Sequence, residues 1–124
     1  MSAKPRCVIV DDDPDFLIFA GSFTVRIRPD FEVTEFPGGL AALEFLAKNQ
    51  VDLVITDYRM PGMNGLQLAS AVRWIYPAMP IVLMSGDDLE KEAVKQGISA
   101  FVAKRSFTAD LTSAIQRLRI PARI

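Results

Sequence analysis

Residues 51–65, VDLVITDYRMPGMNG, join an apolar run to an aspartate and then to a loop that contains Pro and Gly. The run is almost continuously apolar, so it predicts a strand that is buried on both faces, as in a parallel sheet covered by helices. Asp57 directly follows the apolar residues. In such sheets the functional groups gather at the carboxyl ends of the strands. This stretch therefore predicts the kind of sheet and the edge that carries its function.

Two similar apolar runs precede this one and two follow it, with segments of helical period between them. The predicted strands are 7–10, 31–33, 51–56, 80–84 and 100–103, and the predicted helices are 14–27, 39–48, 64–75, 88–96 and 107–119. Pro14 suits a first helical turn and Gly97 suits a helix end. Five βα units in 124 residues predict one α/β domain, residues 1–124, with a (βα)5 doubly wound five-stranded parallel sheet.

The composition excludes several functions. With 14 basic and 15 acidic residues, the chain has no electrostatic footprint for direct binding of nucleic acid or of a membrane. No apolar run approaches the roughly 18 residues that span a bilayer. Cys7 is the only cysteine, which is compatible with a reducing cytosol and predicts a cytoplasmic protein. The absence of histidine excludes His-based catalysis, His-ligated zinc and a role as a phosphohistidine carrier.

Polar residues follow three further strand ends. Asp11 and Asp12 follow the first strand, Ser85 the fourth and Lys104 the fifth. Three carboxylates close together, these two and Asp57, repel one another, which raises pKa values or requires a cation. Hard oxygen ligands favour Mg²⁺, with Mn²⁺ as the alternative, over zinc. Acidic residues also occur at helix N-termini because they complement the helix dipole, and this is the competing interpretation of the acidic run.

Asp57 is the predicted nucleophile of this site. A carboxylate can form a covalent acyl phosphate, and the transferred phosphoryl group needs positive charge and hydrogen bonds around it. Mg²⁺, the ammonium of Lys104 and the hydroxyl of Ser85 are predicted to supply them. No P-loop motif is present, so nucleotide binding has no support.

These residues resemble the receiver domain of two-component response regulators, and the resemblance covers essentially the whole chain. It rests on VIVDDDP (8–14), VITDYRMPGMNG (54–65), IVLMSG (81–86) and FVAK (101–104). The resemblance implies a flavodoxin-like receiver fold and a phosphoacceptor, Asp57, that takes its phosphoryl group from a phosphohistidine. The implied partners are a sensor histidine kinase or a histidine phosphotransfer protein. The domain is thus not an enzyme in its own right, although it takes part in its own phosphorylation and dephosphorylation.

The resemblance also implies roles for the other residues. Asp12 and Asp57 are expected to ligate Mg²⁺ directly, Asp11 mainly through water, and the carbonyl of Arg59 to complete the site. Ser85 and Phe101 are expected to form the switch pair, in which the hydroxyl is drawn to the phosphoryl group and the ring turns inward. Arg59 and Asp87 flank the expected phosphoryl position, and we expect them to pair across the pocket mouth. The alternative is that both are simply solvated charges.

Two features depart from the family pattern. Arg105 follows Lys104 where the family usually has proline, so this peptide bond is predicted to be trans. The segment between Ser85 and Lys104 is shorter than usual, so the helix predicted at 88–96 should lose nearly a turn.

The first predicted helix is unusually apolar. Helical periodicity directs one stripe towards the sheet, namely Phe16, Ala20, Phe23 and Ile27. It directs the opposite stripe outward, namely Leu17, Ile18, Gly21, Ser22 and Val25, with Phe19 on the flank. An exposed apolar face tends to mark an interaction site, so Leu17, Ile18, Ser22 and Val25 are predicted to dock a partner helix, from the phosphodonor or from a second copy in a homodimer. Coverage by the last helix or by a further domain is the alternative.

Two other functions compete with phosphoacceptance. One is a binding module of receiver fold that acts without phosphorylation, and the complete set of site residues argues against it. The other is a phosphohydrolase with an aspartyl intermediate. Such enzymes commonly place a second acid two residues after the nucleophile, where this chain has Arg59.

Overall fold

The computed structural model describes residues 4–122, which form one five-stranded parallel sheet with five α-helices between and after its strands. The strands are β1 (Arg6–Val10), β2 (Glu32–Phe36), β3 (Leu53–Asp57), β4 (Ile81–Ser85) and β5 (Ala100–Ala103). The helices are α1 (Pro14–Ile27), α2 (Gly39–Lys48), α3 (Gly65–Ile75), α4 (Glu90–Lys95) and α5 (Phe107–Leu118), with a 3₁₀ turn, η1 (Lys104–Ser106), before α5. The strand order is β2-β1-β3-β4-β5, which confirms the predicted doubly wound, flavodoxin-like fold.

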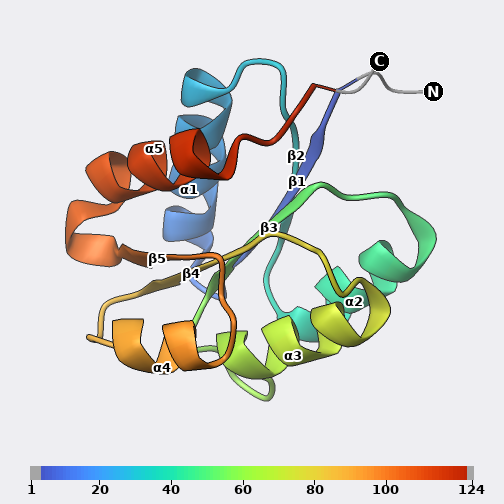
Figure 1. The fold of residues 1–124 in the computed structure, drawn as a ribbon, viewed down its shortest axis with the longest axis vertical. Helices are drawn as coiled ribbons and strands as arrows, with labels where there is room; N and C mark the ends of the chain where they lie inside the picture. The colour runs from blue at the N-terminus through green and yellow to red at the C-terminus, as the bar shows by residue number, and fades with distance from the viewer. Residues whose placement is uncertain (1–3, 123–124) are drawn as a thin grey trace.

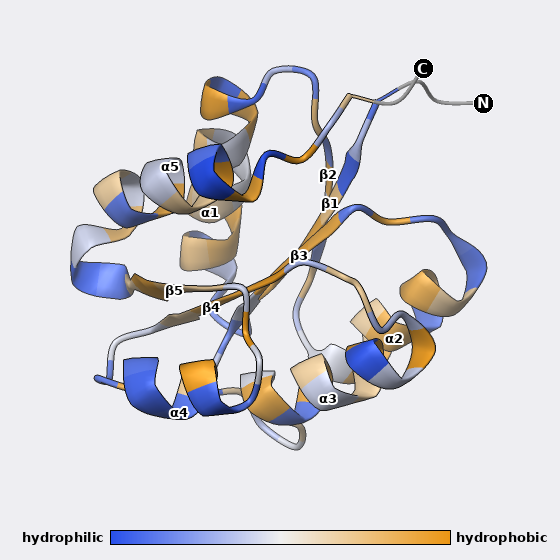
Figure 2. Ribbon diagram, viewed as in Figure 1, coloured by the Kyte–Doolittle hydropathy of each residue, from blue (hydrophilic) through white to orange (hydrophobic). Residues whose placement is uncertain are grey.

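The sheet lies between two layers of helices. Helices α1 and α5 cover one face, and α2, α3 and α4 cover the other (Figure 1). Successive strand residues point to opposite faces, so that Ile9 and Ile55 pack with α1 and α5, whereas Val8 and Val54 pack with α2 and α3. Figure 2 shows the resulting band of apolar strand residues between the layers. This double coverage explains why the central strands are apolar at nearly every position.

The single thiol belongs to this buried core. Cys7 lies in β1 and is completely shielded from solvent, and burial raises the pKa of its thiol well above the ordinary range. Among residues 4–122, no helix combines the length and the apolar character that crossing a membrane requires.

Most predicted boundaries are confirmed, and β2 is the main exception. The predicted strand 31–33 is displaced, because the observed strand runs from Glu32 to Phe36. As an edge strand, β2 pairs only with β1 and keeps a half-exposed face, so it lacks the continuous apolar run of a central strand. Helix α4 has only six residues, which agrees with the predicted shortening, and Gly97 follows its end with a φ of 76°.

The predicted orientation of α1 is partly wrong. Ile18, Ser22 and Val25 are exposed as predicted, but Leu17 and Gly21 are buried against the sheet. Three phenylalanines of α1 instead turn towards α5 and pack around Phe107: Phe16, Phe19 and Phe23. The helix is therefore rotated relative to the prediction, because an aromatic cluster with α5 fixes its position and periodicity alone could not reveal that cluster.

Candidate functional site

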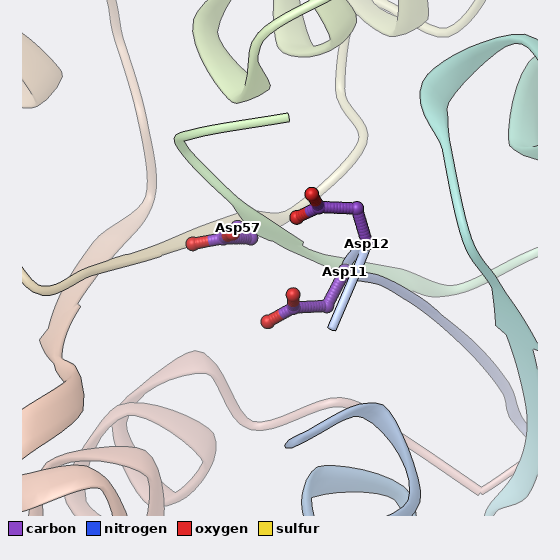
Figure 3. A group of neighbouring side chains, drawn as sticks. All are labelled: Asp11, Asp12 and Asp57. Atoms are coloured by element: carbon purple, nitrogen blue, oxygen red, sulfur yellow. The ribbon is translucent and has the colours of Figure 1, made fainter. Parts of the chain in front are cut away.

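Three carboxylates meet at the carboxyl edge of the sheet. Asp11 and Asp12 follow β1, Asp57 ends β3, and these two strands are neighbours. One carboxylate oxygen from each residue lies within 4.8 Å of the others, and Figure 3 shows the three groups pointing to the same side. Asp11 is fully buried and Asp57 is nearly so, whereas Asp12 is exposed. The predicted carboxylates thus lie together, at the mouth of a site open on one side.

Lys104 reaches the cluster from the end of β5. Its Nζ lies 2.8 Å from Oδ2 of Asp11 and 3.1 Å from Oδ1 of Asp57. Burial lowers the pKa of Lys104, but the hydrogen bond to Asp11 and the charge of Asp57 outweigh burial and raise that pKa overall. The ammonium also lies 4.3 Å from the ring centre of Phe16, a cation–π contact that was not predicted. The only sequence signal for this contact was an aromatic residue, Phe16, at the third position of the helix that follows the acidic pair.

The electrostatics of Asp57 reflect this crowding. Burial and then the charge of Asp11 raise the pKa of Asp57 to about 6, and Lys104 opposes the rise. Three carboxylates face a single ammonium here, so negative charge remains in excess. A site of this kind favours a bound cation.

The donor set suits a small hard cation. The cluster offers oxygen ligands alone, which fits Mg²⁺ better than zinc. Beside it lies an open hollow of about 400 Å³, whose lining includes Asp12, Tyr58, Arg59 and Asn64. Such a hollow leaves room for the waters that Mg²⁺ retains and for a phosphoryl group. Arg59 borders this hollow, where its carbonyl was predicted to serve as a ligand.

Ser85 and Phe101 lie on neighbouring strands, β4 and β5. The register pairs Ser85 with Ala103 and Leu83 with Phe101, so the side chains of Ser85 and Phe101 point to the same face of the sheet. Oγ of Ser85 accepts a hydrogen bond of 2.9 Å from the backbone N–H of Asp87, which fixes the hydroxyl at the carboxyl edge. The ring of Phe101 is half-buried.

Arg59 and Asp87 form the predicted contact across the pocket mouth. Nε of Arg59 donates to Oδ2 of Asp87 at 2.5 Å, which joins the loop after β3 to the loop after β4. The side chain of Arg59 is largely exposed and that of Asp87 is partly exposed, so the pair lies over the entrance rather than inside the site.

Two further contacts hold the backbone of the site in place. Gly65 packs its Cα against the carbonyl of Asp57 so closely that a Cβ would clash with it, so this position requires glycine. The carboxylate of Asp110 accepts hydrogen bonds from the backbone N–H of Ala103 at 3.2 Å and from the hydroxyl of Ser106 at 2.9 Å. Asp110 thereby fixes η1, which carries Lys104. Its role was not predicted, although Ser106 and Asp110 are four residues apart at the start of a helix.

The bond between Lys104 and Arg105 is trans, as predicted, because residues 4–122 contain no cis peptide. Asp110, rather than a proline at position 105, therefore holds the turn after β5 in place.

Comparison with known proteins agrees with this geometry. A family described as "Response regulator receiver domain" matches residues 7–116. The chain is similar to the probable transcriptional regulatory protein NarL of Mycobacterium tuberculosis, at 34% identity over 122 residues, covering 90% of this chain and 53% of that protein. It is also similar to the putative two-component response regulator ARR21 of Arabidopsis thaliana, at 32% identity over 114 residues, covering 91% of this chain and 19% of that protein. The chain thus spans about half or less of the length of these two relatives.

Solved structures show the same architecture. The signal receiver domain of the putative response regulator NarL from Mycobacterium tuberculosis matches with a TM-score of 0.75 at 32% identity, covering 93% of this chain and 95% of that one. The response regulator TrrA of Thermotoga maritima, solved in complex with Mg²⁺ and BeF, matches with a TM-score of 0.83 at 23% identity, covering 92% and 98%. At that identity the second match shows the fold alone.

Proposed function

Because this chain belongs to the response regulator receiver domain family, we propose that it is a phosphoacceptor signalling domain whose Asp57 takes a phosphoryl group in a Mg²⁺-dependent reaction. The observation that carries the proposal is the position of the Asp57 carboxylate, next to two further carboxylates and 3.1 Å from the ammonium of Lys104. An oxygen of Asp57 attacks the phosphorus of a phosphohistidine, the P–N bond breaks, and the imidazole leaves with its electron pair and takes up a proton.

The chain's own residues divide the work around this step. Asp12, Asp57 and the carbonyl of Arg59 would hold Mg²⁺, and Asp11 would bind it mainly through water. Bound Mg²⁺ supplies positive charge to the phosphoryl oxygens. Lys104 is already oriented by Asp11 and Phe16, so it can pair with a phosphoryl oxygen without a large rearrangement.

Ser85 and Phe101 are the proposed switch. Both side chains point to the α3–α4 side of the sheet, so a hydroxyl drawn towards the phosphoryl group would vacate space next to the ring of Phe101. That movement would reshape the surface around α4 and β5.

The proposed phosphodonor is a sensor histidine kinase or a histidine phosphotransfer protein, and the cytoplasm is the proposed location. We also propose that Ile18, Ser22 and Val25, the exposed part of the predicted docking face, contact a partner helix; Leu17 is buried and leaves this set.

Arg59 and Asp87 would control the lifetime of the acyl phosphate. Their ion pair spans the pocket entrance, where it would hinder the approach of water. We expect Arg59→Ala to change the rate of dephosphorylation severalfold, measured after removal of the donor. An unchanged rate would leave the pair as two solvated charges.

Labelling with radioactive acetyl phosphate tests the central proposal. We expect stoichiometric labelling with Mg²⁺, none with EDTA and none for Asp57→Ala. Asp88→Ala, which removes an exposed carboxylate near the same edge, is the matched control and should label normally. Continued labelling of Asp57→Ala at another residue would contradict the assignment. A folded wild-type protein that no donor labels would instead indicate a binding module that acts without phosphorylation.

A further inference from the structure

The outer surface of α1 is apolar and only partly covered. Its exposed fractions are 60% for Ile18, 45% for Phe19 and 41% for Val25, with the exposed Ser22 between them. Helix α5 covers one flank, where Phe107 packs against Phe19 at a ring separation of 5.6 Å. It leaves most of Ile18 open, so the alternative that α5 covers this face does not hold. We call Asp15, Ile18, Phe19, Ser22, Val25 and Arg26 the α1 face.

The α1 face carries opposite charges at its two ends. Asp15 lies in the first turn of α1 and Arg26 in the last turn. Among residues 4–122, the ion pairs involve neither of these two side chains. Asp15, Ile18, Ser22 and Val25 follow one another at intervals of three, four and three residues, which is the spacing of a helix-pairing seam. One end of the seam is therefore acidic, the other is basic, and the middle is apolar.

We propose that the α1 face binds the α1 face of a second copy, with the two helices antiparallel about a two-fold axis between Phe19 and Ser22. In a two-fold interface the same patch must be complementary to itself. The antiparallel arrangement meets this requirement, since Asp15 of each copy then lies near the partner's Arg26. A parallel arrangement would instead bring like charges together.

The middle of the face fits the same arrangement. Ser22 is small, so two helices can approach closely beside the axis. Phe19 would lie opposite the partner's Ser22, whose small side chain leaves room for the ring. Ile18 and Val25 would pack against the partner's apolar residues and become buried in the dimer.

Glu35 limits how the helices can lean. Its side chain lies over Gly21, on the β2 side of α1, where a Cβ on residue 21 would collide with it. If the pair leaned towards β2, the two Glu35 carboxylates would approach each other across the axis. The contact therefore stays on the outer surface of α1 and does not extend over β2.

The proposed dimer is weak and does not rest on phosphoacceptance. A single helix pair forms a small interface, so we expect a dissociation constant on the order of 10–100 µM. No group of the α1 face ligates the metal or receives the phosphoryl group in the proposal above, so dimer formation and labelling of Asp57 can succeed or fail separately.

Sedimentation equilibrium over about 1–300 µM tests the proposal on the complete 124-residue chain. We expect wild type to dimerise and Ile18→Glu with Val25→Glu to raise the dissociation constant at least tenfold. Trp74→Glu, which places the same charge on an apolar side chain of α3 that is 90% exposed, is the matched control and should dimerise like wild type. Circular dichroism and thermal unfolding would verify that each variant is folded.

Charge reversal tests the orientation. Asp15→Arg alone and Arg26→Asp alone should each weaken the dimer several-fold, because each places like charges opposite one another twice. An equimolar mixture of the two variants should restore association, since every reversed charge then meets its opposite. A monomeric wild type, or a double glutamate variant that dimerises like Trp74→Glu, would overturn the proposal. So would a monomeric wild type in which the glutamates block transfer from a histidine phosphodonor, because the α1 face would then belong to the donor.

Discussion

The charge on Asp57 is held in an unfavourable environment before any ligand arrives. Burial and the neighbouring Asp11 disfavour its ionised form, and Lys104 only partly offsets them, so its pKa is raised to about 6. A raised carboxyl pKa means that the folded protein binds the proton more tightly than the unfolded chain does. Stability is then lost as the pH rises from the ordinary carboxyl value of 3.8 through about 6. Removing the charge should therefore stabilise the protein without metal.

We expect Asp57→Asn to be more stable than wild type at pH 7.5 in EDTA, by up to roughly 3 kcal/mol from the size of the pKa shift. The difference should shrink as the pH falls below 6 and be close to zero only near pH 3, below both pKa values, where the carboxyl is largely protonated in both states. Urea unfolding at several pH values measures it, with Asp88→Asn as the control for an exposed carboxylate. A pH-independent difference, or a destabilised variant at pH 7.5, would contradict this account of Asp57.

At the scale of helices and strands, the central strands were predictable and the edge was not. Near-continuous apolarity marks β1, β3 and β4 because both of their faces are covered, and the residues after them identify the functional edge. Edge strand β2 is partly exposed to solvent, so no continuous apolar run marks where it begins and ends.

The orientation of α1 depended on residues far away in the sequence. Leu17, Ile18 and Phe19 are all apolar, so several orientations of the helix satisfy the pattern equally well. Phe107 on α5 and Glu35 on β2 select the observed one. The contact between Phe16 and Lys104 could not be predicted from the sequence for the same reason. The two residues are 88 positions apart, and their residue types alone do not indicate that they touch.

The turn after β5 depends on Asp110 in a way that can be tested. Asp110→Ala removes two hydrogen bonds to a charged acceptor, from Ala103 and Ser106, so we expect a loss of roughly 1–3 kcal/mol in unfolding free energy. The amide of Ala103 should also exchange faster, because it loses its acceptor. Asp110→Asn keeps an acceptor oxygen and should recover part of both effects. Equal behaviour of the two variants and wild type would show that η1 holds its shape without this carboxylate.

For the whole molecule, the site joins the ends of three strands that are distant in sequence. Lys104 at the end of β5 pairs with Asp11 and Asp57, and a cation held by Asp11, Asp12 and Asp57 connects the ends of β1 and β3, two neighbouring strands in the middle of the sheet. Binding to the folded state alone should therefore stabilise the entire domain rather than one loop.

Mg²⁺ at ten times its dissociation constant should raise the unfolding free energy by about 1.4 kcal/mol. Asp12→Asn should lose most of this gain, because the exposed carboxylate nearest the hollow is gone. Thermal unfolding with and without Mg²⁺ measures the effect, and NaCl at matched ionic strength separates binding from screening. If NaCl produced the same increase, the carboxylates would not be a specific site.

The burial of Cys7 makes the protein well suited to site-specific probes. A thiol reacts as its thiolate. The thiol of Cys7 is shielded in the core and has a raised pKa, so it should not react with maleimides while the protein is folded. A cysteine introduced at the exposed Val25 would then be the single reactive position, with no need to remove the native one. A nitroxide attached there would report by electron spin resonance how far apart two such positions lie, and whether that separation changes when the donor is added.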